Sequence, residues 1–127
     1  MKVLTIKEPW ATLIIDGYKM YEFRSWKTNY RGKILIHSGL SIENDMLPRF
    51  KDYNIHCSRG AIIGEAMLTD CVLVDEQFYK QLLEIDPVIY EKSNHSMKYG
   101  FKLENVKKYD NPIYVKGKLG LWNYEVK

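Results

Sequence analysis

The sequence predicts an α+β fold, a small mixed β-barrel of about six strands flanked by two or three helices. Three observations predict it. Short segments with strand-like composition are separated by turn residues, amphipathic helical segments lie between some of them, and 127 residues are enough for one hydrophobic core. We therefore expect a single domain over residues 1–127.

The first elements follow from alternation and from helix-boundary residues. Residues 3–7 alternate in hydrophobicity and predict a strand. Pro9 suits the first turn of a short helix, and Gly17 suits its C-terminal end. Residues 20–26 are rich in aromatic side chains and predict a second strand.

The middle of the chain predicts two more strands and an irregular segment. A turn over residues 27–32 leads to a strand over 33–37, which Gly39 ends. Residues 41–53 read as a helical or irregular segment that Pro48 weakens. Residues 61–74 form one long strand or two consecutive ones.

The last third predicts a helix, a loop and short strands. The helix opens at residues 75–76, and Pro87 ends or restarts it. Residues 93–98 are polar and predict a loop that covers a pocket mouth. The expected final strands cover residues 99–105, 113–117 and 121–126, with turns at 110–112 and 117–120.

Charge is segregated along the chain. Residues 1–33 carry seven Lys or Arg against three acids, residues 98–127 repeat that ratio, and residues 34–97 carry five against ten. If the terminal strands are neighbours, their charges combine into one basic face suited to a phosphate backbone. The alternative is an ordinary solvated surface.

Several classes of protein and site are not expected. The longest apolar runs, residues 13–15 and 71–74, are far shorter than the roughly 20 residues of a membrane helix. No signal peptide develops at the start, so we expect a cytoplasmic protein with Cys57 and Cys71 as free thiols. We expect no metal and no cofactor, because no Cys or His pair has ligand spacing and no Gly-rich phosphate loop is present.

The most informative segment has the spacing GxKxxExR, formed by Gly17, Lys19, Glu22 and Arg24. In a strand Glu22 and Arg24 share one face. A buried Lys19 with a lowered pKa suits a base or nucleophile, Glu22 can move protons, and the fork of Arg24 suits a carboxylate or phosphate. The alternative is an internal Glu22–Arg24 salt bridge that only stabilises the strands.

Five further segments complete a family pattern. They are residues 8–11 (EPWA), 31–38 (RGKILIHS), 60–66 (GAIIGEA), 99–105 (YGFKLEN) and 117–122 (GKLGLW). With them, nearly the whole chain resembles the ASCH domain of the PUA-like superfamily, a small barrel associated with RNA and modified nucleosides. The resemblance implies the fold and the place of a pocket.

One branch of that family resembles amidohydrolases acting on N4-acetylcytidine. Those proteins pair the motif lysine with a threonine three residues on and a downstream acid. Lys19 matches, but Glu22 occupies the threonine position. Hydrolysis here would need a water activated by Glu22 or a different role for Lys19, with Glu65, Asp70 and Glu76 as candidate acids.

Aromatic side chains near the motif suit base stacking. Trp10, Tyr21 and Trp26 are the candidates, and we favour Trp10 and Trp26 because both flank the motif. A core position is an equal alternative for Trp10 and the better one for Trp122.

His37 and Ser38 end the strand after the motif, where related sequences line the cavity. A ribonuclease would use His37 as general base. Nothing in the sequence brings His56 or His95 near it, and lone histidines are usually structural.

These residues support three functions. The first is a binding module for RNA, a nucleotide or a modified nucleoside, with Trp10, Lys19, Tyr21, Glu22, Arg24, Trp26, His37 and Ser38 as ligand-binding residues. The second is an amidohydrolase or ribonuclease using Lys19 and Glu22 as catalytic residues. The third is an accessory protein that binds an unrelated metabolite.

Overall fold

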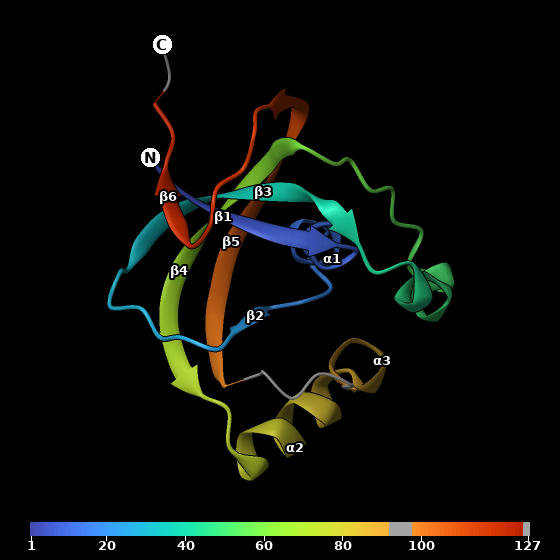
Figure 1. Cartoon of the computed structure of the whole chain (residues 1–127). Coiled ribbons are helices and arrows are strands. Elements are labelled where there is room, and N and C mark those ends of the chain that lie inside the picture. Colours follow the sequence, from blue (N-terminus) through green and yellow to red (C-terminus); the bar gives the residue numbers. More distant parts are fainter. Residues whose placement is uncertain (92–97, 126–127) are drawn as a thin grey trace.

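A six-stranded mixed sheet forms the centre of the computed structural model, which describes residues 1–91 and 98–125 (Figure 1). The strands are β1 (Lys2–Glu8), β2 (Tyr21–Arg24), β3 (Gly32–Ile42), β4 (Ala61–Leu73), β5 (Tyr99–Tyr114) and β6 (Leu121–Asn123). The helices are α1 (Trp10–Ile15), the 3₁₀ segment η1 (Asn44–Tyr53), α2 (Glu76–Ile85) and α3 (Pro87–Tyr90). The α+β class and the strand number are those predicted.

The sheet is curved but not closed into a barrel. Its order is β2-β5-β4-β3-β1-β6, with β1 and β3 parallel and the other neighbours antiparallel. The expected barrel closure is therefore corrected to an open sheet with β2 and β6 at its two ends. Short β6 pairs only with Lys2, Val3 and Leu4 of β1, so the later part of β1 has a free edge.

Two strands run through positions where the sequence predicts an end or a turn. β3 continues past Gly39 to Ile42, and β5 continues through residues 110–112. The predicted turn residues 110–112 instead lie where the pairing between β5 and β4 is irregular. Lys108 pairs with Gly64 and Ile113 pairs with Ile62, so four residues of β5 oppose one of β4.

Local boundary residues act largely as predicted. Gly17 adopts φ +89° and turns the chain out of α1. Asp75 caps α2 by accepting a hydrogen bond from the Phe78 backbone N–H, and Asp86 caps α3, so the chain restarts a helix at Pro87. Of the loop expected over residues 93–98, residues 93–97 lie outside the described residues.

Two hydrophobic clusters pack on the two sides of α1, and a third, which contains Val3 and Trp122, lies away from this helix. Buried side chains of the sheet, including Leu4, Ile36 and Phe101, pack on one side of this helix. Its Leu13 packs on the other side into a second cluster, which contains Phe50 of η1 and the buried side chains Leu82, Ile89 and Tyr90 of α2 and α3. Because α1 is almost wholly buried, it holds the second cluster against the sheet.

The strand pairing brings the basic ends of the chain together in two places. β1 lies beside β6, and β2 lies beside β5, with β3 and β4 between these pairs. The premise that terminal strands are neighbours therefore holds. Across residues 1–91 and 98–125, no helix is long and apolar enough to cross a membrane.

Candidate functional site

A cavity of about 550 Å³ lies where β2 faces the free edge of β1. Its wall comes from β1, the start of α1, β2, the end of β3, η1, α3 and the segment before β6. The polar and aromatic residues among those that line it are Thr5, Lys7, Trp10, Lys19, Glu22, Phe23, Arg24, Ser25, Trp26, Ser41, Glu43, Tyr90, Glu91 and Lys118. A volume of this size is in the range of small-molecule sites.

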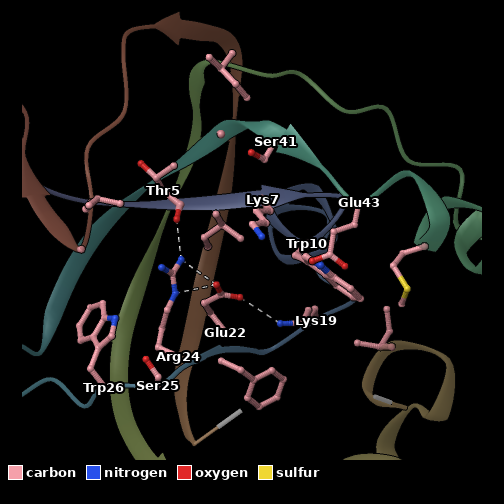
Figure 2. Close-up of a pocket in the computed structure, with 18 of the residues that line it drawn as sticks. Thr5, Lys7, Trp10, Lys19, Glu22, Arg24, Ser25, Trp26, Ser41 and Glu43 are labelled. Carbon is pink, nitrogen blue, oxygen red and sulfur yellow. Dashed lines mark hydrogen bonds and ion pairs between the residues drawn. The ribbon is translucent and has the colours of Figure 1, made fainter. Parts of the chain in front are cut away.

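The predicted charged cluster lies at the centre of this wall (Figure 2). Arg24 Nε and Nη2 both contact Glu22 Oε2, at 3.0 and 2.9 Å. Lys19 Nζ lies 3.4 Å from Glu22 Oε1. Alternation along β2 placed Glu22 and Arg24 on one face as predicted, and the turn at Gly17 brings Lys19 beside them.

Lys19 is held in a buried, partly aromatic environment. Only 5% of the residue is exposed. Its ammonium lies 4.6 Å from the ring centre of Phe23 and 5.6 Å from that of Trp10. Burial lowers the pKa of Lys19 below its usual 10.5, and this effect outweighs the opposite effect of the Glu22 carboxylate. A lowered pKa gives Lys19 a neutral fraction at lower pH than an exposed lysine has.

The two cations also satisfy backbone carbonyls on the facing strand edges. Arg24 Nη2 donates to the Thr5 carbonyl oxygen at 2.7 Å, which links β2 to β1. Lys19 Nζ donates to the Tyr21 carbonyl oxygen. The Met20 carbonyl already pairs with Leu103 of β5, so by antiparallel alternation the Tyr21 carbonyl lies on the other, free edge of β2. The cluster thus satisfies one carbonyl on each of the two edges without closing the sheet.

Aromatic side chains stand on either side of this cluster. In the view of Figure 2, Trp10 and Trp26 lie on opposite sides of the Glu22–Arg24 pair. Trp10 packs edge-on against Phe50, and Trp26 packs edge-on against Phe101. Both indoles are half-buried, so each keeps an exposed part in the cavity wall. Such surfaces suit a flat ligand.

The outer part of the cavity carries further charges. Exposed Lys7 and Lys118 line it, together with half-buried Glu43 and exposed Glu91. With Lys19, Glu22 and Arg24, the lining holds four cations and three acids. The lining is therefore mixed in sign, with cations both at the centre and at the rim.

Three sequence candidates lie away from the cavity lining. Tyr21 faces the opposite side of β2 and packs against Phe78, with ring centres 5.2 Å apart. His37 is 1% exposed and contacts the Thr5 hydroxyl through Nδ1 at 3.2 Å and the Val115 carbonyl through Nε2 at 2.7 Å. The fully buried Ser38 hydroxyl donates to Glu8 Oε2.

A buried carboxylate that the sequence did not single out organises this region. Glu8 is fully buried, and its carboxylate accepts hydrogen bonds from the Thr12 backbone N–H at 2.8 Å, the Thr12 hydroxyl at 2.6 Å and the Ser38 hydroxyl at 2.7 Å. It joins the start of α1 to β3, and so holds Trp10 in place. The sequence signal that could have identified Glu8 is its position at the start of the EPWA segment, residues 8–11.

The candidate downstream acids also lie elsewhere. Glu65, Asp70 and Glu76 do not line the cavity, and Glu65 instead contacts Lys33 and Tyr109. Glu43 and Glu91 line the cavity and were not predicted, because nothing in their local sequence marks them. Among the described residues, no group of three His, Cys, Asp or Glu side chains is arranged to hold a metal ion.

Comparison with known proteins agrees with this fold and motif. Residues 4–113 match the ASCH domain family. The chain belongs to the ASCH domain family. This family has a PUA-like fold and is associated with RNA binding.

The ASCH chain is 29% identical over 137 aligned positions to activating signal cointegrator 1 of Mus musculus, and 31% identical over 94 positions to that of Homo sapiens. These alignments cover 98% and 65% of this chain, but only 22% and 16% of the relatives. The crystal structure of ASCH from Zymomonas mobilis is similar with a TM-score of 0.57 at 18% identity, over 89% of this chain and 72% of that one. This likeness shows the fold.

The lowered pKa of Lys19 predicts a specific pH dependence of stability. Between that pKa and 10.5 the unfolded chain binds more protons at Lys19 than the folded chain, so this residue's contribution to the free energy of unfolding rises with pH, by at most about 1.4 kcal/mol per pH unit. Urea unfolding of the wild type and Lys19→Met across this range measures the difference. We expect the wild type to gain stability relative to Lys19→Met as pH rises.

Lys80→Met is the matched control, because Lys80 is exposed on α2. The same pH series on Lys80→Met measures the effect of losing an exposed ammonium, and the wild type should gain more stability relative to Lys19→Met than relative to Lys80→Met as pH rises. A flat or falling difference for Lys19→Met would show that its ammonium is not destabilised by burial.

Proposed function

We propose that this ASCH domain is a binding module that holds a base of RNA, or of a nucleotide or modified nucleoside, in the cavity around the GxKxxExR motif. The observation that carries the proposal is that Lys19, Glu22 and Arg24 line one cavity together with the indoles of Trp10 and Trp26. Nucleic-acid bases are commonly bound by stacking on aromatic rings and by hydrogen bonds to their edges. The cavity wall supplies both.

The rim supports contact with phosphate. Lys7 and Lys118 line the outer cavity, and their exposed side chains have no acidic partner among the described residues. The ammonium group of Lys118 lies 6.0 Å from the ring centre of Trp122. Ammonium groups held near a base pocket attract a phosphate backbone. A bound base thus places its phosphate toward these two lysines.

The compartment is part of the same proposal. Cys57 and Cys71 are free thiols, as is usual in a reducing compartment. We therefore place this binding function in the cytoplasm.

Hydrolysis of an acylated cytidine nucleoside is the second candidate function, and one observation favours it. Lys19 is buried in the cavity wall with a lowered pKa, which suits a base or nucleophile. The hydroxyls argue against it. Ser25 and Ser41 line the cavity, but neither is hydrogen-bonded to Lys19 or Glu22 in the described structure, and the Thr5 hydroxyl contacts Trp122 and His37.

Binding to single-stranded RNA should weaken steeply with salt, because release of counterions drives phosphate contacts. Fluorescence anisotropy with a short mixed-sequence RNA at several salt concentrations measures this dependence. Replacing Lys7 or Lys118 by Gln should reduce the slope of log K against log salt by roughly 0.7 for each lysine. Lys80→Gln is the control and should leave the slope unchanged, because Lys80 is exposed on α2 and does not line the cavity. Equal slopes for the wild type and the three variants would show that Lys7 and Lys118 do not contact phosphate.

Trp26→Ala should weaken binding of a stacked base by roughly 1–3 kcal/mol. Titration of the same RNA onto the wild type and the variant gives the difference. Tyr114→Ala is the matched control, because Tyr114 is 72% exposed and does not line the cavity. If both substitutions have the same small effect, Trp26 does not stack on the base.

A binding module should leave both candidate substrates intact. We expect no deacetylation of N4-acetylcytidine and no cleavage of a short RNA, because Glu22 supplies no hydroxyl nucleophile. Chromatography of the reaction mixtures measures both reactions. Turnover by the wild type that is lost in Lys19→Ala would instead establish an enzyme. Turnover retained in Lys19→Ala would point to a contaminating activity.

A further inference from the structure

The residues that join β5 to β6 form part of the cavity rim. Residues 115–120, here called the rim segment, belong to no helix or strand, and Lys118, Leu119 and Gly120 among them line the cavity. Since no strand ladder fixes this segment, its position depends on individual contacts with the rest of the protein.

The buried side chain of His37 holds the start of the rim segment. The Val115 backbone N–H donates to the Gly60 carbonyl oxygen at 3.1 Å, and the Val115 carbonyl oxygen lies 2.7 Å from His37 Nε2. Because a carbonyl oxygen can only accept, Nε2 carries a hydrogen and donates it to Val115. His37 is 1% exposed, so it acts on the segment from the interior of the protein.

The Thr5 hydroxyl connects the same imidazole to the residue that follows the rim segment in β6. Trp122 Nε1 donates to Thr5 Oγ1 at 3.0 Å, and Thr5 Oγ1 lies 3.2 Å from His37 Nδ1. An indole N–H can only donate, so the Thr5 oxygen accepts from Trp122 and its own hydrogen is left to donate to Nδ1. Both ring nitrogens of a neutral His37 are then satisfied, and they connect to the two ends of the rim segment.

Gly117 approaches this imidazole closely in the middle of the rim segment. A Cβ atom at position 117 would lie 2.7 Å from His37 Cε1 and 2.8 Å from Thr5 Oγ1, closer than a Cβ atom approaches its neighbours in proteins. Glycine is therefore needed here for space. His37 belongs to the RGKILIHS segment of the sequence, and Gly117 and Trp122 belong to the GKLGLW segment, so two parts of the family pattern meet at this contact.

Lys118 directly follows Gly117 and carries the charge of the rim segment into the cavity lining. Its ammonium lies 6.0 Å from the ring centre of Trp122, the indole that also donates to Thr5. A cation on a loose segment loses more conformational freedom on binding a phosphate than a cation that is already held in place. Fixing the rim segment in the free protein therefore favours the phosphate contact.

We propose that the rim segment is a pre-formed phosphate-binding arm, and that His37 and Gly117 are positioning residues that hold Lys118 where it meets the phosphate of a bound nucleotide. The inference rests on the proposed base-binding function. Thr5 joins this arm to the charged cluster, because its carbonyl oxygen accepts from Arg24 Nη2 (Figure 2). One residue of β1 thus contacts both parts of the site.

The salt dependence of RNA binding tests the inference, because the slope of log K against log salt reports the number of phosphate contacts. Gly117→Ala removes no charge and no hydrogen-bonding group. Its methyl group must displace the rim segment, since both nitrogens of His37 are held. In fluorescence anisotropy with the short mixed-sequence RNA, we expect the slope to fall by roughly 0.7, as for Lys118→Gln.

Two double variants show whether this loss belongs to Lys118. Gly117→Ala combined with Lys118→Gln should have the same slope as either single variant. Gly117→Ala combined with Lys7→Gln should lose a further roughly 0.7, because Lys7 lies on β1 and not on the arm. A further fall on adding Lys118→Gln would overturn the inference, since the displaced segment would then still present Lys118 to phosphate.

Substitutions of His37 give a second readout. His37→Leu removes both ring nitrogens and should also lower the slope by roughly 0.7. His37→Gln is the conservative variant, because its side-chain amide supplies an N–H for the Val115 carbonyl, and it should restore the wild-type slope. A purely structural role would reduce the amount of folded protein and leave the slope of every variant at the wild-type value.

A measurement on the wild type does not depend on the folding of any variant. NMR relaxation of the free protein should give backbone order parameters of about 0.85 for Gly117 and Lys118, as in rigid backbone. Values below about 0.6 would overturn the inference, because the arm would then not be pre-formed.

The outcomes separate this inference from the proposed function. If the wild type binds the RNA but Gly117→Ala and His37→Leu keep its slope, the positioning role is overturned and base binding stands. If Lys118→Gln keeps the wild-type slope, Lys118 does not contact phosphate and the arm is overturned alone. If the wild type does not bind the RNA, the proposed function fails and this inference fails with it.

Discussion

The facing free edges of β1 and β2 are the constraint on which the site depends. Strand edges present carbonyl and N–H groups that need partners. At this opening, Arg24 satisfies the Thr5 carbonyl and Lys19 satisfies the Tyr21 carbonyl, while Glu22 pairs with both cations. Because side chains rather than a strand ladder bridge the edges, the sheet stays open and the cavity lies in the opening.

The same cluster links stability to binding. A buried carboxylate between two cations is costly to desolvate, and it is held by good geometry and hydrogen bonds. Within residues 1–91 and 98–125, Arg24 Nη1 and one N–H of Lys19 have no hydrogen-bond partner, and all three side chains line the cavity. A ligand that supplies the missing partners therefore stabilises charges that the fold has already removed from water.

A second buried carboxylate fixes the aromatic side of the site. Glu8 connects Thr12 of α1 to Ser38 of β3, and α1 begins at Trp10, directly after Pro9. Trp10 is therefore held against the sheet at the start of a helix whose other residues are buried. The opposite wall, with Trp26, packs on Phe101 of β5. The two indoles are positioned by different parts of the core, and this keeps the space between them.

The sequence by itself determined the α+β class, the family and the charged cluster that lines the cavity. These depend on local rules: alternation along β2 places Glu22 beside Arg24, and the glycine at position 17 turns Lys19 toward them. The tertiary structure alone decided that His37 and Ser38 serve the interior, that β5 absorbs a turn signal in a bulge, and that Glu43 rather than Glu65 faces the cavity. The physical reason is that these outcomes depend on strand register and on the open sheet edge, which are set by contacts between residues far apart in the chain.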